Sequence, residues 1–296
     1  MHYTEPLYRP PFEASTPLLQ VTRGCSHNAC TFCSMYVGQD FAASPLSEVV
    51  EDLAELAAWR PDATRIFLEA GDAFALSADR LLTLAELIHA HLPDIDSIAC
   101  YASIRNVRDK TDDELVALAA AGYTDLNIGV ESGLDDVLAS MNKGFTREES
   151  GRELARLRAA GIGYSLNIIN GAAGPQRLME HATANAALVN EAQPELIFVS
   201  PLHVDAGTPL QALVEQGGFE ECTLGQYLEE EVAFVRQLEL QGCVFFGAHV
   251  SNPVPVNAWL PRDKEKLVQL LCEGRDRFSA EELAGHPSKG AEGALR

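Results

Sequence analysis

The chain has 296 residues, 47% of them hydrophobic, which is enough apolar material to bury a large core in a single domain. Its formal net charge of −21 repels a phosphate backbone, and this argues against DNA or RNA as a partner. We therefore expect a small molecule or a peptide as the substrate.

Residues 1–12 are polar and proline-rich and contain no apolar signal sequence, and no segment approaches the roughly 18 consecutive apolar residues of a membrane span. The cysteine count is odd, with only the first three cysteines clustered, unlike the set of a secreted disulfide framework. These features predict a soluble protein of the reducing cytoplasm. The clustered cysteines are Cys25, Cys30 and Cys33; Cys100 and Cys243 lie in apolar runs and are expected in the core, and Cys222 and Cys272 lack ligand spacing.

Six short apolar segments are predicted to be strands: residues 18–21, 65–68, 98–104, 126–130, 164–169 and 196–200. Helical patterns alternate with them over residues 44–59, 77–91, 111–122, 146–161 and 178–190, with a further short helix before residue 142. Capping boxes begin at Thr111 and Thr146. This alternation predicts parallel βαβ units, arranged as an open doubly wound sheet or as a closed or partial barrel.

The pattern loosens after residue 200. Residues 223–238 read as an acidic helix, residues 243–246 as an apolar run and residues 264–272 as a last helix, while residues 279–296 are expected to fray. No repeat or linker marks a second domain, so we expect one domain with short extensions.

Polar residues follow the C-terminal ends of the predicted strands. Because these ends of parallel strands meet on the same side of a sheet or barrel, the residues are expected to gather on one rim. Taken singly, they are ordinary features of solvated turns, and only their common position distinguishes them. They are residues 25–33, Gly71, Asp72, residues 103–105, Glu131, Ser132, residues 167–171, Leu202 and His203.

Three cysteines, Cys25, Cys30 and Cys33, form a CxxxxCxxC pattern directly after the first predicted strand. Thiolates are the preferred ligands of both iron–sulfur clusters and zinc. A structural zinc site usually has four protein ligands, whereas the sequence has no second CxxC pair and His27 is awkwardly close to Cys25. Three cysteines suit a [4Fe–4S] cluster with one open iron, which is the favoured interpretation over zinc.

This loop, its position after the first strand and the aromatic Phe32 before its last cysteine resemble the radical S-adenosylmethionine (SAM) superfamily, whose usual spacing, CxxxCxxC, is one residue shorter. The resemblance covers residues 9–210 and is to a branch of small, single-domain members, distantly similar to coproporphyrinogen-dehydrogenase-like and Elp3-like cores. It implies an α/β fold, a partial (β/α)6 TIM-type barrel of parallel strands with a short α-rich C-terminal extension. Residues 1–17 would form an N-terminal extension, residues 18–210 the barrel, and residues 211–296 an extension that packs on or caps it.

The resemblance also implies the cofactors, a [4Fe–4S] cluster and SAM, and the residues that bind them. Cys25, Cys30 and Cys33 would each ligate one iron, and the open iron would take the amino and carboxylate groups of SAM. The residues implied to contact SAM are Phe32 and Ile169 at the adenine, Gly71 and Asp72 at the ammonium, Ser103, Glu131 and Asn167 at the ribose and methionine moieties, and Lys143 at the carboxylate.

In this family a reduced cluster splits SAM into methionine and a 5′-deoxyadenosyl radical, which takes a hydrogen atom from the substrate. The resemblance therefore implies an enzyme acting on a small organic substrate or a peptide, with an external electron donor such as flavodoxin or ferredoxin. It assigns no catalytic residue beyond the cofactor site. Two alternatives stay open: a non-catalytic iron–sulfur protein for electron transfer or cluster delivery, and a zinc-stabilised barrel.

Overall fold

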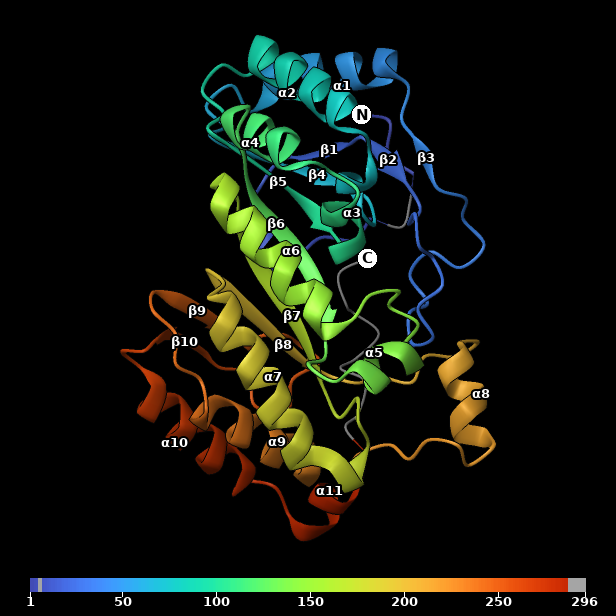
Figure 1. Ribbon diagram of the computed structural model, residues 1–296, viewed down its shortest axis with the longest axis vertical. Helices are drawn as coiled ribbons and strands as arrows, with labels where there is room; N and C mark the ends of the chain where they lie inside the picture. Colours follow the sequence, from blue (N-terminus) through green and yellow to red (C-terminus); the bar gives the residue numbers. More distant parts are fainter. Residues whose placement is uncertain (5–6, 287–296) are drawn as a thin grey trace.

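The computed structural model describes residues 1–4 and 7–286 as a curved sheet with helices packed around it (Figure 1). Neighbouring strands of this sheet run parallel from β1 to β9, and β10 is antiparallel to β9. This is the predicted α/β fold, a partial TIM-type barrel. The strands, in their order across the sheet, are β1 (Leu18–Gln20), β4 (Arg65–Glu69), β5 (Ser97–Ala102), β6 (Tyr123–Glu131), β7 (Gly163–Asn170), β8 (Leu196–Pro201), β9 (Cys243–Phe246) and β10 (Asn257–Leu260).

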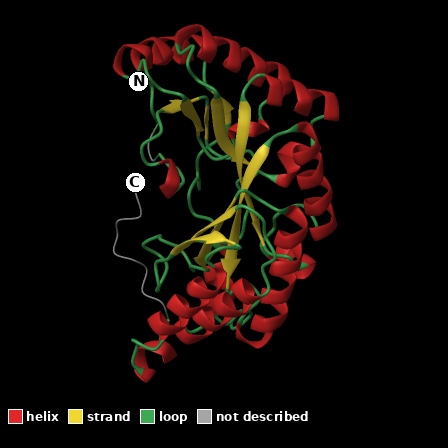
Figure 2. Cartoon of the chain, turned by 90° about the vertical axis from the view of Figure 1, so that its left-hand side faces the viewer, coloured by secondary structure: helices red, strands yellow, loops and turns green. Residues whose placement is uncertain are grey.

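Helices form the crossovers between the parallel strands, and they lie on one side of the curved sheet (Figure 2). Capping boxes at Thr111 and Thr146 start α4 and α6, as the sequence predicts. The helices are α1 (Leu46–Trp59), α2 (Ala78–His91), α3 (Ile104–Arg108), α4 (Asp112–Ala120), α5 (Asp135–Ser140), α6 (Arg147–Ala160), α7 (Leu178–Ala192), α8 (Pro209–Glu215), α9 (Leu224–Arg236), α10 (Lys264–Arg275) and α11 (Ala280–Ala284).

The two faces of the sheet differ in chemistry, because alternate residues of a strand point to opposite faces. Residues of the outer face form one apolar core with the helices: Ile66, Leu68, Ile98, Cys100, Leu126, Ile128, Leu166 and Ile168. The alternate residues of the same strands face the concave side, and many are polar: Arg65, Glu69, Ser97, Tyr101, Asp125, Asn127, Ser165 and Asn167. The outer layer therefore holds the fold, while the inner face is available for polar contacts.

An ion-pair cluster closes the inner face at the N-terminal end of the strands. Arg65, the first residue of β4, pairs with Asp125 of β6 at 2.6 Å and with Glu13 of the short 3-10 helix η1 (Pro11–Glu13). It also donates a hydrogen bond of 2.6 Å to the hydroxyl of Ser97. Glu13 is almost fully buried, so its charge needs this partner. The segment before β1 thus covers one end of the barrel interior and leaves the other end for the site.

The structure adds elements that periodicity does not predict. Residues 243–246 form β9, a seventh parallel strand, because its Phe245 completes the outer core beside β8. The strand expected over residues 98–104 ends at Ala102, since Ser103 forms a capping box with Asn106 and starts α3. Helix α8 is also unpredicted, although Pro209 directly after a capping threonine is a helix-start signal.

The expectation of fraying over residues 279–296 is wrong for its first part. Ser279 forms a capping box that starts α11, and the carbonyl of Gly285 accepts a hydrogen bond of 2.8 Å from the backbone N–H of Leu224. Residues 287–296 lie outside the described residues.

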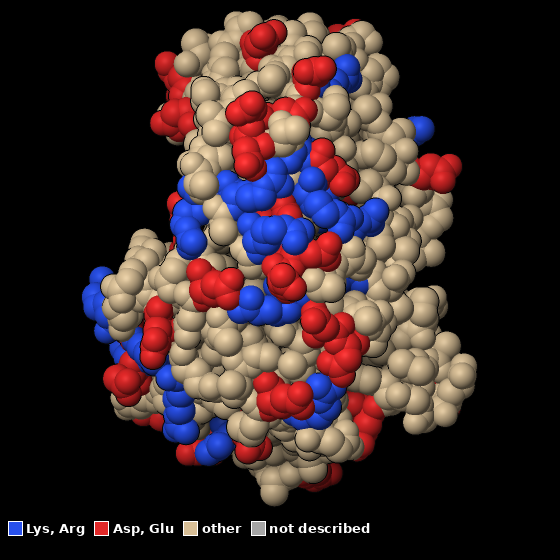
Figure 3. Space-filling view, viewed as in Figure 1, with Lys and Arg blue, Asp and Glu red and all other residues tan. Residues whose placement is uncertain are grey.

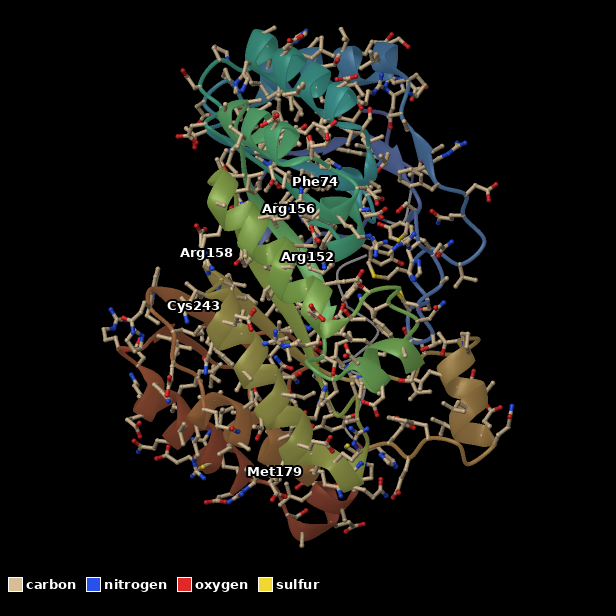
Figure 4. The ribbon with its side chains drawn as sticks, in the orientation of Figure 1. Phe74, Arg152, Arg156, Arg158, Met179 and Cys243 are labelled. Atoms are coloured by element: carbon tan, nitrogen blue, oxygen red, sulfur yellow. The ribbon has the colours of Figure 1, made fainter. Side chains whose placement is uncertain are left out.

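Cys100 and Cys243 are fully buried, as expected. Figure 4 shows Cys243 on β9, on the side of the molecule away from the cysteine loop. Among the residues that the structure describes, no helix combines the length and the apolar character that crossing a membrane requires.

The unpredicted strand β9 provides a test of the fold. Phe245 on β9 is fully buried, whereas Trp259 on the adjacent β10 is 53% exposed. Phe245→Ala is expected to lower the free energy of unfolding by about 3–5 kcal/mol, because it leaves a cavity in the core. Trp259→Ala is the matched control and should stay within about 1 kcal/mol of the unmodified protein. Urea unfolding followed by circular dichroism measures both, and equal midpoints would show that β9 is not an integral strand.

Candidate functional site

The cysteine loop joins two short strands, β2 (Thr22–Arg23) and β3 (Ala42–Ala43), directly after β1. The strands pair antiparallel, so both ends of the loop are held together. Its three cysteines are half-buried and free of disulfides. Because the loop follows the C-terminal end of β1, it lies on the predicted rim.

The surroundings of the three thiols fit thiolate ligands of a cluster. Burial raises the pKa of each of the three thiols. The pKa of Cys25 rises to about 11. Backbone N–H groups of His27 and Asn28 favour the Cys25 thiolate, and the Lys143 ammonium favours the Cys30 thiolate. Bound iron would use these same donors, since hydrogen bonds to sulfur are part of iron–sulfur sites. Within residues 1–4 and 7–286 no three His, Cys, Asp or Glu side chains are grouped around a single-ion site; the three cysteines of a [4Fe–4S] cluster each bind a different iron.

The residues between Cys25 and Cys30 dock the loop on neighbouring elements. The Nε2 of His27 lies in hydrogen-bonding contact with the carbonyl of Asn142, and because a carbonyl only accepts, Nε2 carries the proton. The Nδ1 of His27 is then left to accept from Arg105 of α3. Asn142 donates from Nδ2 to the carbonyl of Ala29 at 2.8 Å. Asn142 directly precedes Lys143. The segment between Cys25 and Cys30, which is one residue longer than in CxxxCxxC, therefore makes the contacts that hold Lys143 beside the cysteine loop.

Gly71, after β4, is in direct contact with the cysteine loop. A Cβ added at Gly71 would lie 2.6 Å from Cε2 of Tyr36 and 2.9 Å from Cβ of Cys25. Carbon atoms do not approach one another so closely, so any side chain at this position would displace the loop. The requirement for glycine is therefore steric: the turn after β4 packs directly against Cys25 and Tyr36 of the loop.

Asp72 binds the loop with its carboxylate, which is almost fully buried. Its Oδ1 accepts from the backbone N–H of Ser26 at 2.8 Å, and its Oδ2 accepts from the Ser26 hydroxyl. Burial raises the pKa of Asp72, and the hydrogen bonds from Ser26 act in the opposite direction. Because Ser26 follows Cys25, Asp72 fixes the position of the first cysteine.

Glu131 and Lys143 form a buried ion pair at the C-terminal end of β6. Nζ of Lys143 lies 3.1 Å from Oε1 of Glu131 and 5.9 Å from the centre of the Phe32 ring. Glu131 has a φ of +67°, and its carboxylate folds back over Gly129, where a Cβ would lie 2.1 Å from Oε1. Burial lowers the pKa of Lys143, but the charges of Glu131 and Cys30 outweigh it and the pKa lies above its ordinary value. The ammonium therefore stays charged beside the cysteine loop.

A fully buried network holds the residue after Glu131. His181 of α7 bonds through Nδ1 to Glu230 of α9 at 2.6 Å and through Nε2 to the Ser132 hydroxyl at 2.9 Å. The second oxygen of Glu230 accepts from the backbone N–H of Gly171 at 2.8 Å. The order Ser–His–Glu is that of a hydrolase triad, but the Ser132 side chain is 0% exposed and meets no substrate. The network instead joins the loops after β6 and β7.

The other predicted SAM contacts are two polar residues, Ser103 and Asn167, and two apolar residues, Phe32 and Ile169. Ser103 caps α3, and its hydroxyl accepts from the backbone N–H of Asn106 at 3.3 Å. Asn167 is a half-buried residue of the inner face of β7. Ile169, two residues further on, belongs to a second apolar cluster, and Phe32 of the cysteine loop packs against the same cluster. The two residues predicted at the adenine are thus brought together.

His203 lies in a separate pocket of the rim. With Gln211 and Glu215 of α8, it lines a pocket of about 300 Å³. Nearby Asp205 accepts a hydrogen bond of 2.7 Å from the hydroxyl of Ser34 in the cysteine loop. The segment between β8 and α8 is therefore tied to the same loop.

Two arginines of the outer surface, Arg152 and Arg156, are paired with carboxylates. Figure 3 shows Lys and Arg gathered over the middle of one face, and Figure 4 places Arg152 and Arg156 of α6 there. Arg156 pairs with Asp112 at 2.6 Å and with Glu153 at 2.5 Å, and Arg152 pairs with Glu153 at 2.9 Å. These two arginines therefore belong to an ion-pair network, and Arg158 beside them donates to the backbone carbonyls of Glu191 and Ala192.

Two further charged residues belong to the site. Arg105, one of the residues expected on the rim after the third strand, contacts His27. Glu69 ends β4 on the inner face and accepts from the backbone N–H of Tyr8 at 2.9 Å. Burial raises the pKa of Glu69 to about 7. Alternation along β4 places Glu69 on the same face as Arg65, and this is the signal that reveals it.

Residues 19–177, more than half of the chain, match the Radical SAM superfamily. The tRNA-2-methylthio-N(6)-dimethylallyladenosine synthase of Aromatoleum aromaticum is 27% identical over 221 residues, which cover 69% of this chain and 47% of that protein. The heme chaperone HemW of Bacillus subtilis is 24% identical over 199 residues, which cover 65% of this chain and 52% of that protein. The chain thus spans about half the length of these curated relatives.

Solved structures share the fold. Methylornithine synthase (PylB) superposes with a TM-score of 0.59 at 12% identity, over 95% of this chain and 76% of that chain. Coproporphyrinogen III oxidase (HemN) from Escherichia coli gives a TM-score of 0.52 at 20% identity, over 75% and 53% of the two chains. The methyltransferase TsrM from Kitasatospora setae, solved with cobalamin and a [4Fe–4S] cluster bound, gives 0.54 at 21% identity, over 68% and 39%.

The contact at Gly71 predicts a specific defect. Gly71→Ala should reduce the iron content after anaerobic reconstitution to roughly half or less, because the added methyl group takes the space of Tyr36 and Cys25. Gly285→Ala is the matched control, since the nearest atom to its Cβ would be 3.4 Å away and its φ of −82° suits any residue. Iron and sulfide assays measure both variants. Full iron content in Gly71→Ala would contradict the packing argument.

Glu69 should titrate near neutrality, since burial raises its pKa from 4.5 to about 7. In the unmodified protein, the infrared band of the protonated Glu69 carboxyl should disappear as the pH rises, with a midpoint near pH 7. The band is assigned to Glu69 by its absence in Glu69→Gln. A raised pKa also means that the stability from Glu69 is fully present below pH 4.5 and is lost as the pH rises through about 7. The difference in unfolding free energy between the unmodified protein and Glu69→Gln should therefore fall by about 3 kcal/mol across this range. If this difference in unfolding free energy did not change with pH, the Glu69 side chain would be exposed to water and the prediction would be contradicted.

Proposed function

Because this chain belongs to the radical SAM superfamily, its cofactors are a [4Fe–4S] cluster and SAM, and we propose that it is an enzyme that removes a hydrogen atom from a small organic substrate. When bound and reduced, the cluster supplies the electron that splits SAM into methionine and the 5′-deoxyadenosyl radical that takes this hydrogen. One observation carries the proposal: the cysteine loop, the turn at Gly71 and the Glu131–Lys143 pair converge at one end of the barrel.

The proposed cluster ligands are Cys25, Cys30 and Cys33, each on its own iron. Lys143 is proposed to bind the SAM carboxylate, and its support is a charged, buried ammonium whose field reaches Cys30. Asp72 is proposed to accept from the SAM ammonium. Its two carboxylate oxygens have more lone pairs than the two hydrogen bonds from Ser26 use.

The remaining SAM contacts are proposed from their place around the rim. Phe32 and Ile169 share one apolar cluster, which would give the adenine an apolar seat. Asn167 on the inner face of β7 is proposed at the ribose, and Glu131 and Ser103 at the ribose and methionine moieties.

The proposed barrel interior is closed on several sides, which would keep water away from the radical. The Arg65 cluster covers the end opposite the site. Residues 211–296 are proposed to act as a C-terminal extension of the barrel, since their β9 pairs with β8 and the hydroxyl of Tyr227 on α9 donates to the carbonyl of Leu202 at 2.9 Å.

The substrate is proposed to be a small molecule or a peptide rather than a nucleic acid. Some of the curated relatives are named for an adenosine of tRNA. This chain carries a net charge of −21, and Arg152 and Arg156 in the basic patch of its outer face are paired with carboxylates. A polyanion would therefore meet a negative potential. We also propose the reducing cytoplasm as the location, with flavodoxin or ferredoxin as the electron donor.

Anaerobic reconstitution should give about four iron and four sulfide per chain, as a [4Fe–4S] cluster requires. Dithionite and SAM should then yield 5′-deoxyadenosine and methionine, measured by mass spectrometry, and a metabolite screen for faster 5′-deoxyadenosine formation would identify the substrate. A protein that holds the cluster but never cleaves SAM would support electron transfer or cluster delivery. Zinc without iron would support the zinc-stabilised barrel.

Three variants separate the roles in this experiment. Cys30→Ala should lose the cluster, whereas Cys272→Ala, a half-buried cysteine outside the loop, should keep it and serves as the matched control. Lys143→Gln should keep its iron and raise the KM for SAM about tenfold, the effect of losing one charge-assisted hydrogen bond. An unchanged KM would remove Lys143 from the SAM site.

A further inference from the structure

One carboxyl group of the barrel interior has no cationic partner among the described residues. Glu69 is 1% exposed, and the backbone N–H of Tyr8 donates to it at 2.9 Å. Its pKa rises to about 7 through burial, and no described lysine or arginine opposes this. When ionised, the carboxylate is thus a buried charge that has one backbone N–H and no cationic partner among the described residues, which is unfavourable unless a cation binds.

Glu69 is connected to two aromatic pairs, one through the backbone N–H of Tyr8 and one through Phe67, two residues earlier on the same face of β4. Tyr8 and Tyr36 meet edge to face with ring centres 5.4 Å apart, and Phe67 and Tyr101 do so at 5.3 Å. Burial and, next, the charge of Glu69 raise the pKa of both Tyr36 and Tyr101, so the field of the carboxylate reaches both hydroxyls. Tyr101 is only half-buried and connects this cluster with the open part of the inner face.

Two polar atoms beside this cluster lack partners within the described part of the chain. The hydroxyl of Tyr36 is buried and unpaired, and so is Nδ2 of Asn127, which pairs in register with Tyr101 on the neighbouring strand. Buried polar groups are normally hydrogen-bonded, so unpaired ones indicate a missing partner. The ring of Tyr36 also touches Gly71, and this places the cluster next to the cysteine loop.

We propose that Glu69, Tyr36 and Tyr101 form a binding site for a protonated amino group of the substrate, inside the barrel and beside the cysteine loop. The carboxylate supplies the opposite charge, the tyrosine oxygens accept N–H bonds, and the rings attract the cation. The proposal rests on the proposed function, because it assumes that the substrate enters the barrel. It narrows the substrate class to small amines.

The other charges of the interior favour the same class. Arg65, at the opposite end of β4, is held by two carboxylates, and Lys143 is paired with Glu131. Both cations are thus already engaged, Lys143 also with the proposed SAM carboxylate, and a carboxylate or phosphate substrate would face the charge of Glu69.

The test uses n-propylammonium as the probe, with propionate and n-propanol as matched probes of opposite and zero charge. Binding to the reconstituted protein is measured by saturation-transfer NMR at pH 7.5, without reductant. Propylammonium should bind at least about tenfold more tightly than either matched probe, and Glu69→Gln should remove this preference. Tyr36→Phe deletes only the unpaired hydroxyl and should weaken binding about fivefold.

Glu195→Gln is the control variant, because Glu195 is an exposed acid at the opposite end of the strands, and it should leave propylammonium binding unchanged. Equal binding of propylammonium and propanol, or binding that survives Glu69→Gln, overturns the proposal. A Glu69→Gln variant that loses SAM affinity while keeping propylammonium would assign Glu69 to SAM and also overturns it.

The measurement involves no SAM cleavage, so its outcome is separate from that of the proposed function. If the protein binds the cation through Glu69 but never forms 5′-deoxyadenosine, the amine site is supported and the proposed activity is contradicted. If it cleaves SAM but shows no preference for the cation, only the amine site is contradicted.

Discussion

The contact between the turn after β4 and the cysteine loop is the constraint on which the site depends. At Gly71 the two segments approach so closely that even a methyl group would meet Cys25 and Tyr36. This approach brings the Asp72 carboxylate to Ser26, the residue after the first cysteine. The Tyr36 ring lies against Gly71 at the same contact, and the charge of Glu69 reaches its hydroxyl. The lack of a Cβ at Gly71 therefore permits the close approach of the cysteine loop to the rim and the inner face.

Around this contact the rim behaves as one connected unit. The cysteine loop is tied through His27 and Ala29 to Asn142, and hence to Lys143. Behind the rim, the buried network of His181 and its partners joins the loops after β6 and β7. Because these side chains are fully buried and each bond has a defined partner, the network resists independent movement of the two loops. The loops that present the proposed SAM contacts are thus held by the same outer helices that form the core.

The two faces of the sheet divide stability and chemistry between them. The outer face is a continuous apolar layer with the helices, so it needs no polar partners. The inner face carries buried charges, which are acceptable only where they are paired, as in the Arg65 cluster and the Glu131–Lys143 pair. Glu69 departs from this rule, and the departure is what marks its surroundings as a ligand site.

The sequence by itself determined the parallel α/β architecture, the rim and the cluster loop, because these depend on local signals. Strand and helix periodicity, capping boxes and the spacing of Cys25, Cys30 and Cys33 are all contained within short windows of the chain. Only the tertiary structure decided β9, the partner of Asp72 and the isolation of Glu69. Ser26 and Asp72 are 46 positions apart, and Tyr8 and Glu69 are 61 apart. Such pairings follow from strand order, register and the path of the connecting segments. A single sequence carries no local signal for them, because the contacts form only when the sheet has assembled.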